Sequence, residues 1–141
     1  MKSMRPFHLA FPVNDLTSTR SFYKSVLGAT EGRSSDSWVD FNLFGHQIVA
    51  HIDNESCNQN FSNNFVDGDK VPVPHFGVVL SVVEWKQLAD RISREGWKFE
   101  IPPKLRFKGT SGEQWSMFLK DPSGNALEFK SFENPDMLFA S

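Results

Sequence analysis

Two histidines and one glutamate in this sequence are of the right types to bind a divalent metal ion together. His8 and His75 each begin an apolar, strand-like run that leads into a helical pattern closed by a glycine, and Glu128 lies in a third strand-like run, 126–131. Two imidazoles and one carboxylate form the facial ligand set that leaves coordination positions open on the metal. The sequence therefore predicts a metal site of the open kind that enzymes use in catalysis.

Each of these residues has a simpler explanation when it is taken alone. A single histidine on a strand is more often a hydrogen-bonded structural group, and a strand glutamate such as Glu128 usually pairs with a cation (Lys130 or Arg106) or with solvent. The repeat favours the metal, because two of the four histidines occupy equivalent points of a duplicated motif. Fe(II), Mn(II), Ni(II) and Zn(II) all suit such ligands, and spacing does not choose among them.

The elements that must position these residues follow one order in both halves. The first half begins with alternation over 7–12 that places Phe7, Leu9 and Phe11 on one strand face and His8 on the other. Asn14 or Asp15 can then cap a helix that ends at Gly28. About three strands are expected after the helix, two of them at 38–44 and 47–52 around the turn 44–46.

The second half repeats this order from His75. A strand over 75–80 is followed by the capping-box pair Ser81 and Glu84, and the helix ends at Gly96. The remaining pattern predicts strands at 97–101 and 115–119, a turn at 121–125 and a last strand at 126–131. The stretch 102–114 is expected to be a loop that covers a pocket.

The 141 residues fit one compact domain built from two modules. We expect module 1 at about 5–53, a polar linker at 54–73 to which no chemistry is assigned, module 2 at about 74–132, and a C-terminal tail at 133–141.

Composition excludes several classes of partner. A formal net charge of −2 and a pI near 6.1 provide no basic surface for nucleic acid or an anionic membrane. No apolar stretch has the length of a signal peptide or spanning helix, so a cytoplasmic location is expected. Cys57 is the only cysteine and rules out an intrachain disulfide, in keeping with a reducing compartment.

Five further residues are candidates for the surroundings of the metal. His51, on the fourth strand of the first half, could be a fourth ligand or an acid/base group acting on the substrate. Three aromatic side chains could shape an apolar pocket: Trp38, Trp115 and Phe118. Arg106 could bind a substrate carboxylate.

The chain resembles the vicinal oxygen chelate (VOC) superfamily, the glyoxalase, bleomycin-resistance, fosfomycin-resistance and extradiol dioxygenase group. The resemblance covers essentially the whole chain and is most specific in the phrase Asp-Pro-Ser-Gly-Asn-Ala-Leu-Glu-Phe. The other matching segments are the His8 strand with Asp15-Leu16, the helix end 22–28 and the His75 strand. The resemblance implies an α+β fold of paired βαβββ modules that curl around a metal, with His8, His75 and Glu128 as ligands.

The resemblance also implies that the substrate, a small molecule, chelates the metal through two adjacent oxygens. We expect an extradiol-dioxygenase-like oxidoreductase that uses Fe(II) or Mn(II), with His51 near the substrate as the catalytic group. Ring-cleaving relatives also use a tyrosine near the metal, and the only tyrosine here, Tyr23, lies in a helical phrase that usually packs.

Two other functions stay open at this point. A glyoxalase-like isomerase, a lyase or a thiol transferase could use the same site with Ni(II) or Zn(II), although His51 stands where a glyoxalase I would carry a glutamate. A metal-free binding protein similar to the bleomycin-sequestering proteins would need no such ligands. A homodimer is expected from the resemblance.

Overall fold

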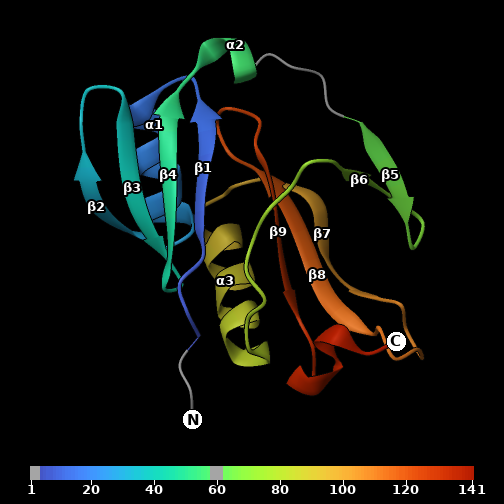
Figure 1. Cartoon of the computed structure of the whole chain (residues 1–141). Helices are drawn as coiled ribbons and strands as arrows, with labels where there is room; N and C mark the ends of the chain where they lie inside the picture. The colour runs from blue at the N-terminus through green and yellow to red at the C-terminus, as the bar shows by residue number, and fades with distance from the viewer. Residues whose placement is uncertain (1–3, 58–61) are drawn as a thin grey trace. The chain divides into compact units, whose positions relative to one another are not determined.

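The computed structural model describes residues 4–57 and 62–141, which divide into two compact units (Figure 1). Unit 1 comprises Met1–Gln59 and Pro122–Asn125, and unit 2 comprises Asn60–Asp121 and Ala126–Ser141. The short segment 122–125 belongs to unit 1 because the Asn125 amide donates to the Pro12 carbonyl at 2.7 Å and the Ser123 hydroxyl accepts from the Asn14 amide at 2.9 Å. The predicted linker 54–73 is divided between the units, and its residues 58–61 lie outside the described part.

Unit 1 has the predicted order of one strand, one helix and three strands. Its described strands form a sheet of order β1-β4-β3-β2, in which β1 and β4 are parallel and the other neighbours antiparallel. A short helix, α2, follows the last strand. The elements are β1 (His8–Val13), α1 (Leu16–Ser21), η1 (Phe22–Val26), β2 (Thr30–Ser34), β3 (Trp38–Leu43), β4 (His46–Ile52) and α2 (Asn54–Cys57).

The helix of unit 1 begins and ends where its capping residues predict. Asp15 is the N-cap, and its carboxylate accepts from the Ser18 amide at 2.7 Å. The chain leaves the helix at Gly28, whose φ of 77° favours glycine. The helix covers one sheet face, where the Tyr23 ring stacks on Phe41 with a centroid distance of 5.2 Å. The opposite face carries His8.

Unit 2 contains a hairpin followed by the second βαβββ order. The hairpin is β5 (Asn63–Val66) and β6 (Asp69–Pro72), and the sheet has the order β7-β8-β9. Residues 76–80 run parallel to β9 with isolated bridges at Phe76 and Val79, so they take the place of the predicted first strand. The other elements are α3 (Val82–Arg94), β7 (Phe99–Arg106), β8 (Gln114–Lys120), β9 (Ala126–Ser131) and η2 (Pro135–Phe139).

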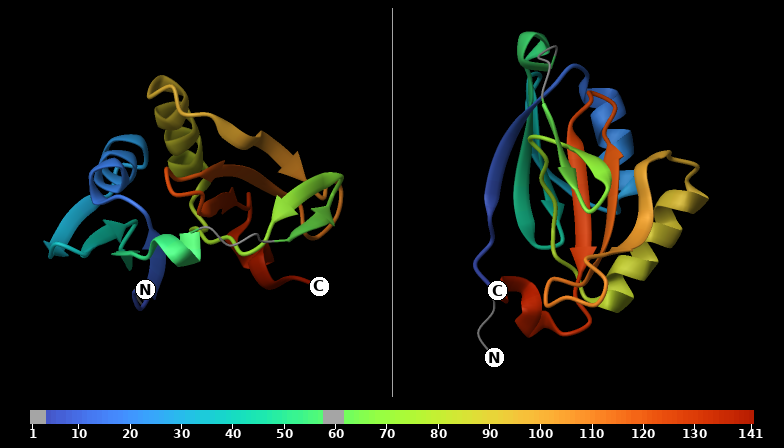
Figure 2. Two further views of the ribbon diagram at one scale, coloured as in Figure 1. Left: turned by 90° about the horizontal axis from the view of Figure 1, so that it is seen from above. Right: turned by 90° about the vertical axis from the view of Figure 1, so that its right-hand side faces the viewer.

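Helix α3 confirms the predicted capping box and apolar stripe. Ser81 and Glu84 exchange the reciprocal cap hydrogen bonds. The helix runs along one face of the β7-β8-β9 sheet (Figure 2) and buries Trp85, Leu88 and Ile92. The Trp85 indole donates to the Phe129 carbonyl at 2.8 Å, which fixes the helix to β9.

One sequence expectation about this unit is wrong. Residues 102–106 are not part of a loop, because β7 continues to Arg106. The pairing of β7 with β8 shifts register around Pro102 and Pro103. Prolines are tolerated there because β7 is an edge strand. The polar linker contains the β5–β6 hairpin, which turns at Asp67-Gly68.

In unit 1, Phe7 was expected on the helix-facing side and is 65% exposed instead.

Among the described helices, none is long and apolar enough to cross a membrane.

Candidate metal centre

His75 and Glu128 are brought together in unit 2 by backbone pairing between segment 76–80 and β9. The Phe76 carbonyl accepts from the Glu128 amide at 2.8 Å, and the Leu80 amide donates to the Lys130 carbonyl at the same distance. Gly77 permits this close approach, since a Cβ atom there would lie 1.5 Å from the Glu128 carbonyl oxygen. The pairing places Glu128 beside the start of the His75 segment.

The imidazole of His75 is oriented by one backbone carbonyl. Its Nδ1 lies 2.7 Å from the carbonyl oxygen of Pro72, which can only accept, so Nδ1 carries a hydrogen and donates it. In the neutral ring, Nε2 then has the free lone pair. That atom lies 3.2 Å from Glu128 Oε1, which is also an acceptor. Two acceptors facing each other at this distance require a cation between them, either a proton or a metal ion.

The Glu128 carboxylate is held by a second contact. Its Oε2 accepts from the Ser116 hydroxyl at 2.5 Å, and Lys130 Nζ lies 3.8 Å from Oε1. The side chain is only 10% exposed. Burial acts to raise the pKa of this carboxyl, but the hydrogen bonds from His75 and Ser116 outweigh it and hold the pKa below its usual value. Glu128 is therefore an anion at neutral pH, as a metal ligand must be.

The pKa of His75 is raised, chiefly by the hydrogen bond to Glu128, with burial acting in the opposite direction. Without a metal ion, a proton on Nε2 thus stabilises the pair.

The separation of the two acceptor atoms fits a bound metal ion. Imidazole nitrogens and carboxylate oxygens bind divalent zinc at about 2.0–2.2 Å. Two ligand atoms at that distance, separated by roughly a right angle at the metal, lie about 3 Å apart. The Nε2–Oε1 distance of 3.2 Å is close to this value. The described part of unit 2 adds no third histidine, cysteine or acidic ligand to the pair.

In unit 1, His8 is oriented in the same way by a side chain. The carboxylate of Asp40 accepts from Gln47 Nε2 at 3.4 Å, which turns the amide oxygen of Gln47 toward His8. That oxygen lies 2.8 Å from His8 Nδ1, so Nδ1 donates and Nε2 is left as the lone-pair nitrogen. A hydrogen bond from Nδ1 to an oxygen acceptor is typical of histidines that bind a metal through Nε2. His8 is exposed on its sheet face and available for a ligand.

Two of the four predicted pocket residues lie on the face of unit 2 that carries Glu128. Phe118 pairs directly with Glu128 across β8 and β9, and its ring meets the His75 ring edge to face at 5.0 Å. The Arg106 guanidinium lies over the same Phe118 ring at 5.5 Å. Trp115 is on the opposite face, where it packs against Trp85 at 5.8 Å, so the structure does not bring it to His75.

The fourth pocket residue, Trp38, lies in unit 1. It pairs with His51 across β3 and β4, and its side chain is half-buried. The Trp38 side chain shares a sheet face with His8 and His51.

Comparison with known proteins identifies the family. The model of the Glyoxalase/Bleomycin resistance protein/Dioxygenase superfamily matches residues 5–129. The chain belongs to this superfamily. The resemblance stated from the sequence is thus confirmed, and with it the α+β fold class. No curated protein matches the sequence significantly.

Solved structures of the superfamily share the fold. A glyoxalase/bleomycin resistance protein/dioxygenase from Alicyclobacillus acidocaldarius is 28% identical, with 96% of each chain covered and a TM-score of 0.78. The fosfomycin resistance protein FosX from Listeria monocytogenes is 20% identical, covering 99% of this chain and 100% of its own, with a TM-score of 0.69. A lactoylglutathione lyase from Agrobacterium tumefaciens is 17% identical over 100% of both chains, with a TM-score of 0.67.

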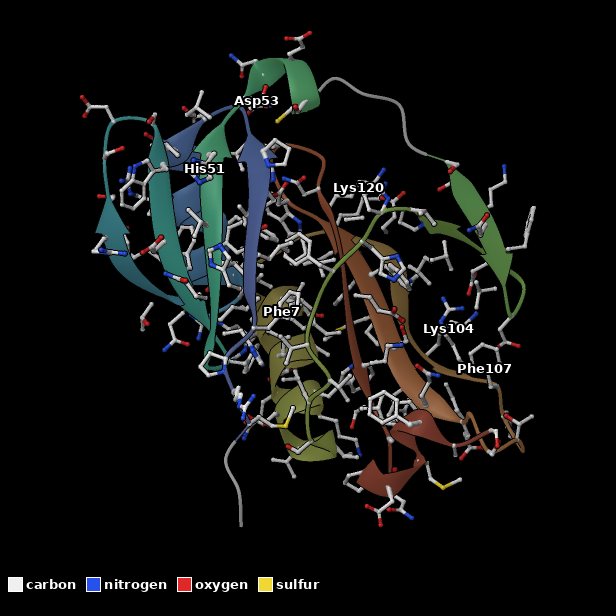
Figure 3. All side chains as sticks on the ribbon, viewed as in Figure 1. Phe7, His51, Asp53, Lys104, Phe107 and Lys120 are labelled. Carbon is white, nitrogen blue, oxygen red and sulfur yellow. The ribbon has the colours of Figure 1, made fainter. Side chains whose placement is uncertain are left out.

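Equivalent strand pairings in the two units show which residue of unit 2 corresponds to His51. In unit 1, Pro12 pairs with His51, and in unit 2, Val79 pairs with Lys130. His51 therefore corresponds to Lys130, and the counterpart of Glu128 is Val49, two residues earlier on β4. His51, placed from the sequence on the fourth strand of the first half, is thus two residues beyond the position equivalent to Glu128. His51 still shares the sheet face of His8, is exposed and lies near the end of β4 (Figure 3).

Sequence reasoning missed the groups that orient the candidate ligands. These are Gln47 for His8, the Pro72 carbonyl for His75, and Ser116 for Glu128. Ser116 could have been suspected, since it alternates with buried apolar residues on its strand. Gln47 and the Pro72 carbonyl have no signal in the sequence, because their roles depend on strand register and on the hairpin fold.

Proposed function

We propose that this chain is a metal-dependent enzyme in which His8, His75 and Glu128 hold a divalent ion. One observation carries the proposal: His75 Nε2 and Glu128 Oε1 face each other at 3.2 Å, while Nδ1 of the same ring is committed to the Pro72 carbonyl. The Pro72 carbonyl and the Ser116 hydroxyl hold the two groups in place, as outer contacts do for metal ligands. A metal-free binding protein would not need His8, His75 and Glu128 as ligands.

His8 is the best candidate for the third ligand. The described part of unit 2 supplies only two, so a third must come from unit 1 or from a second copy of the chain. The His8 ring already has its Nδ1 bound to Gln47 and its Nε2 free. A homodimer, which the superfamily resemblance implies, is compatible with either source.

The reaction that we propose is the opening of a catechol-type ring by dioxygen, with Fe(II) or Mn(II) as the metal. Three protein ligands leave positions for the two adjacent oxygens of the substrate and for dioxygen. When bound, the metal supplies a Lewis acid that favours the deprotonated diol. Both atoms of dioxygen end in the ring-opened product, so no further reductant is needed.

The chain's own acid/base group in this proposal is His51. Tyr23 is the only tyrosine in the sequence and is fully buried against Phe41, so it cannot reach a substrate. His51 is exposed on the same sheet face as His8 and can accept a proton from a substrate hydroxyl.

The buried tyrosine also favours a second candidate function. Isomerase, lyase or thiol-transfer chemistry on the same metal, with Ni(II) or Zn(II) as further choices, needs a base but not a tyrosine near the metal.

The experiment that separates these functions begins with protein freed of metal and reloaded with Fe(II), Mn(II), Ni(II) or Zn(II). Dioxygen uptake with catechols is measured against turnover of the methylglyoxal–glutathione adduct. Dioxygen uptake that is lost in His51→Gln, with metal content retained, supports ring opening. Turnover of the adduct alone selects isomerase chemistry. The absence of both activities with all four metals would contradict both enzyme functions.

A further inference from the structure

A second group of charged side chains lies on the same sheet face of unit 2 as Glu128. Lys104 and Arg106 lie on β7, and both contact Asp69 at the start of β6. Arg106 Nη2 is 3.0 Å from Asp69 Oδ2, and Lys104 Nζ makes a short ion pair with the same oxygen. Figure 3 labels Lys104. We call Lys104, Arg106 and Asp69 the cationic cluster, because two positive charges face one negative charge.

Arg106 is buried but incompletely paired. Its side chain is 2% exposed, and Nη1 donates to the Val66 carbonyl at 3.0 Å. The contact of Nη2 with Asp69 lacks hydrogen-bond geometry, and Nε has no hydrogen-bond partner among the described residues. A buried guanidinium without a full set of acceptors is costly. Its planar fork of donors matches the two oxygens of a carboxylate.

The cationic cluster adjoins the candidate metal ligand through one aromatic ring. Phe118 is 1% exposed, and its ring contacts the Arg106 guanidinium and makes a T-shaped contact with the His75 imidazole. The hairpin that carries Asp69 also provides the Pro72 carbonyl that orients His75. The candidate metal ligand and the incompletely paired guanidinium therefore belong to one packed region of unit 2.

We propose that the cationic cluster binds a carboxylate of the substrate, so that the substrate is an acid whose two adjacent oxygens bind the metal. A dihydroxybenzoate has this form, whereas catechol itself lacks the acidic group. The binding of the two adjacent oxygens to the metal rests on the function proposed above. Asp69 already occupies one side of the cluster and competes with the incoming carboxylate, and Lys104, with its side chain 36% exposed, gives access from solvent.

The test uses 3,4-dihydroxybenzoate and its neutral counterpart 3,4-dihydroxybenzamide, titrated calorimetrically into anaerobic Fe(II)-loaded protein. Charge-assisted hydrogen bonds predict that the acid binds about 10-fold to 100-fold more tightly than the amide. Arg106→Met and Lys104→Met should reduce this ratio toward one, and Asp69→Asn should increase it. The matched control is Asp67→Asn on the same hairpin. The Asp67 carboxylate accepts from the Phe107 amide at 3.1 Å, and this variant should leave the ratio unchanged.

A parallel titration of metal-free protein with benzoate and benzamide separates the two proposals. Preference for benzoate that is lost in Lys104→Met supports the cationic cluster even if no metal binds and the enzyme proposal fails. Equal binding of acid and amide by the wild-type protein overturns the cluster proposal, whatever the metal does. Lys104→Met, at a partly exposed position, keeps the test decisive if the buried Arg106 variant does not fold.

Discussion

His75 Nε2 lies 3.2 Å from Glu128 Oε1, and the other nitrogen of the same imidazole is bound to the Pro72 carbonyl. The pair can be neutralised by a proton on Nε2 or by a metal ion between the two atoms. Proton and metal therefore compete for one position. This competition can be measured as a pH dependence of metal affinity and of protein stability.

Metal affinity should fall as pH is lowered through the raised pKa of His75. The hydrogen bond to Glu128 raises that pKa above the usual value of 6.5, so a metal must displace the proton from His75 up to a higher pH than from an ordinary imidazole. Calorimetric titration in two buffers of different ionisation enthalpy should show proton release on metal binding. If His75→Gln released as many protons on metal binding as the wild type, the assignment of the proton to His75 would be contradicted.

Stability of the metal-free protein should also depend on this pair. Glu128 has a lowered pKa, so its contribution is present above about 4.5 and is lost as pH falls through the folded-state value. His75 has a raised pKa, so its contribution is present below 6.5 and is lost as pH rises through the folded-state value. The difference in unfolding free energy between wild type and His75→Gln should therefore be largest between pH 4.5 and 6.5. Denaturant titrations across pH measure it, and a difference independent of pH would argue against the ion pair.

The residues that orient the ligands should affect metal affinity without being ligands. Gln47→Leu leaves His8 Nδ1 without its acceptor, and Ser116→Ala removes the donor to Glu128 Oε2. Losses of such outer contacts typically weaken metal binding about 10-fold to 100-fold. The matched controls are Gln87→Leu and Ser93→Ala on the exposed side of α3, which should bind metal as the wild type does.

Gly77→Ala should destabilise the protein and disturb Glu128 together. A Cβ atom at this position would meet the Glu128 carbonyl oxygen at 1.5 Å, so segment 76–80 must move away from β9. Overpacking of this kind typically costs about 1–3 kcal/mol. Gly112→Ala is the control, because its nearest contacts of 3.7–3.9 Å are ordinary. Thermal unfolding compares the two, and equal melting temperatures would show that the strands separate without cost.

The sequence was sufficient to predict the order of strands and helices and to single out His75 and Glu128, which the structure brings together, because both lie in strand-like runs with period-two alternation. The full ligand set of His8, His75 and Glu128 stays a prediction. The sequence was insufficient where long-range register decides a role. The pairing of Pro12 with His51 and of Val79 with Lys130 makes Val49 the counterpart of Glu128, and no local pattern reveals this.

Local signals also misled at the edge of the second sheet. The stretch 102–114 was expected to be a loop, but Pro102 and Pro103 lie within an edge strand, whose shifted register tolerates them. The Asp67-Gly68 turn is a hairpin signal, yet its flanking strands are too polar and short to be recognised. That hairpin contributes Asp69 and the Pro72 carbonyl, which is why the cationic cluster and the orientation of His75 could be found only from the structure.

The most direct test of the metal centre is the metal content and Fe(II) or Mn(II) affinity of four proteins: wild type, His8→Ala, His75→Ala and His46→Gln. His46 accepts a hydrogen bond from the Phe7 amide at 2.9 Å and serves as the histidine control. Elemental analysis of protein purified without chelators, with circular dichroism to confirm folding, should show about one metal per chain in wild type and His46→Gln. Folded His8→Ala and His75→Ala should lack it. Full metal content in either of these two variants would contradict the ligand assignment.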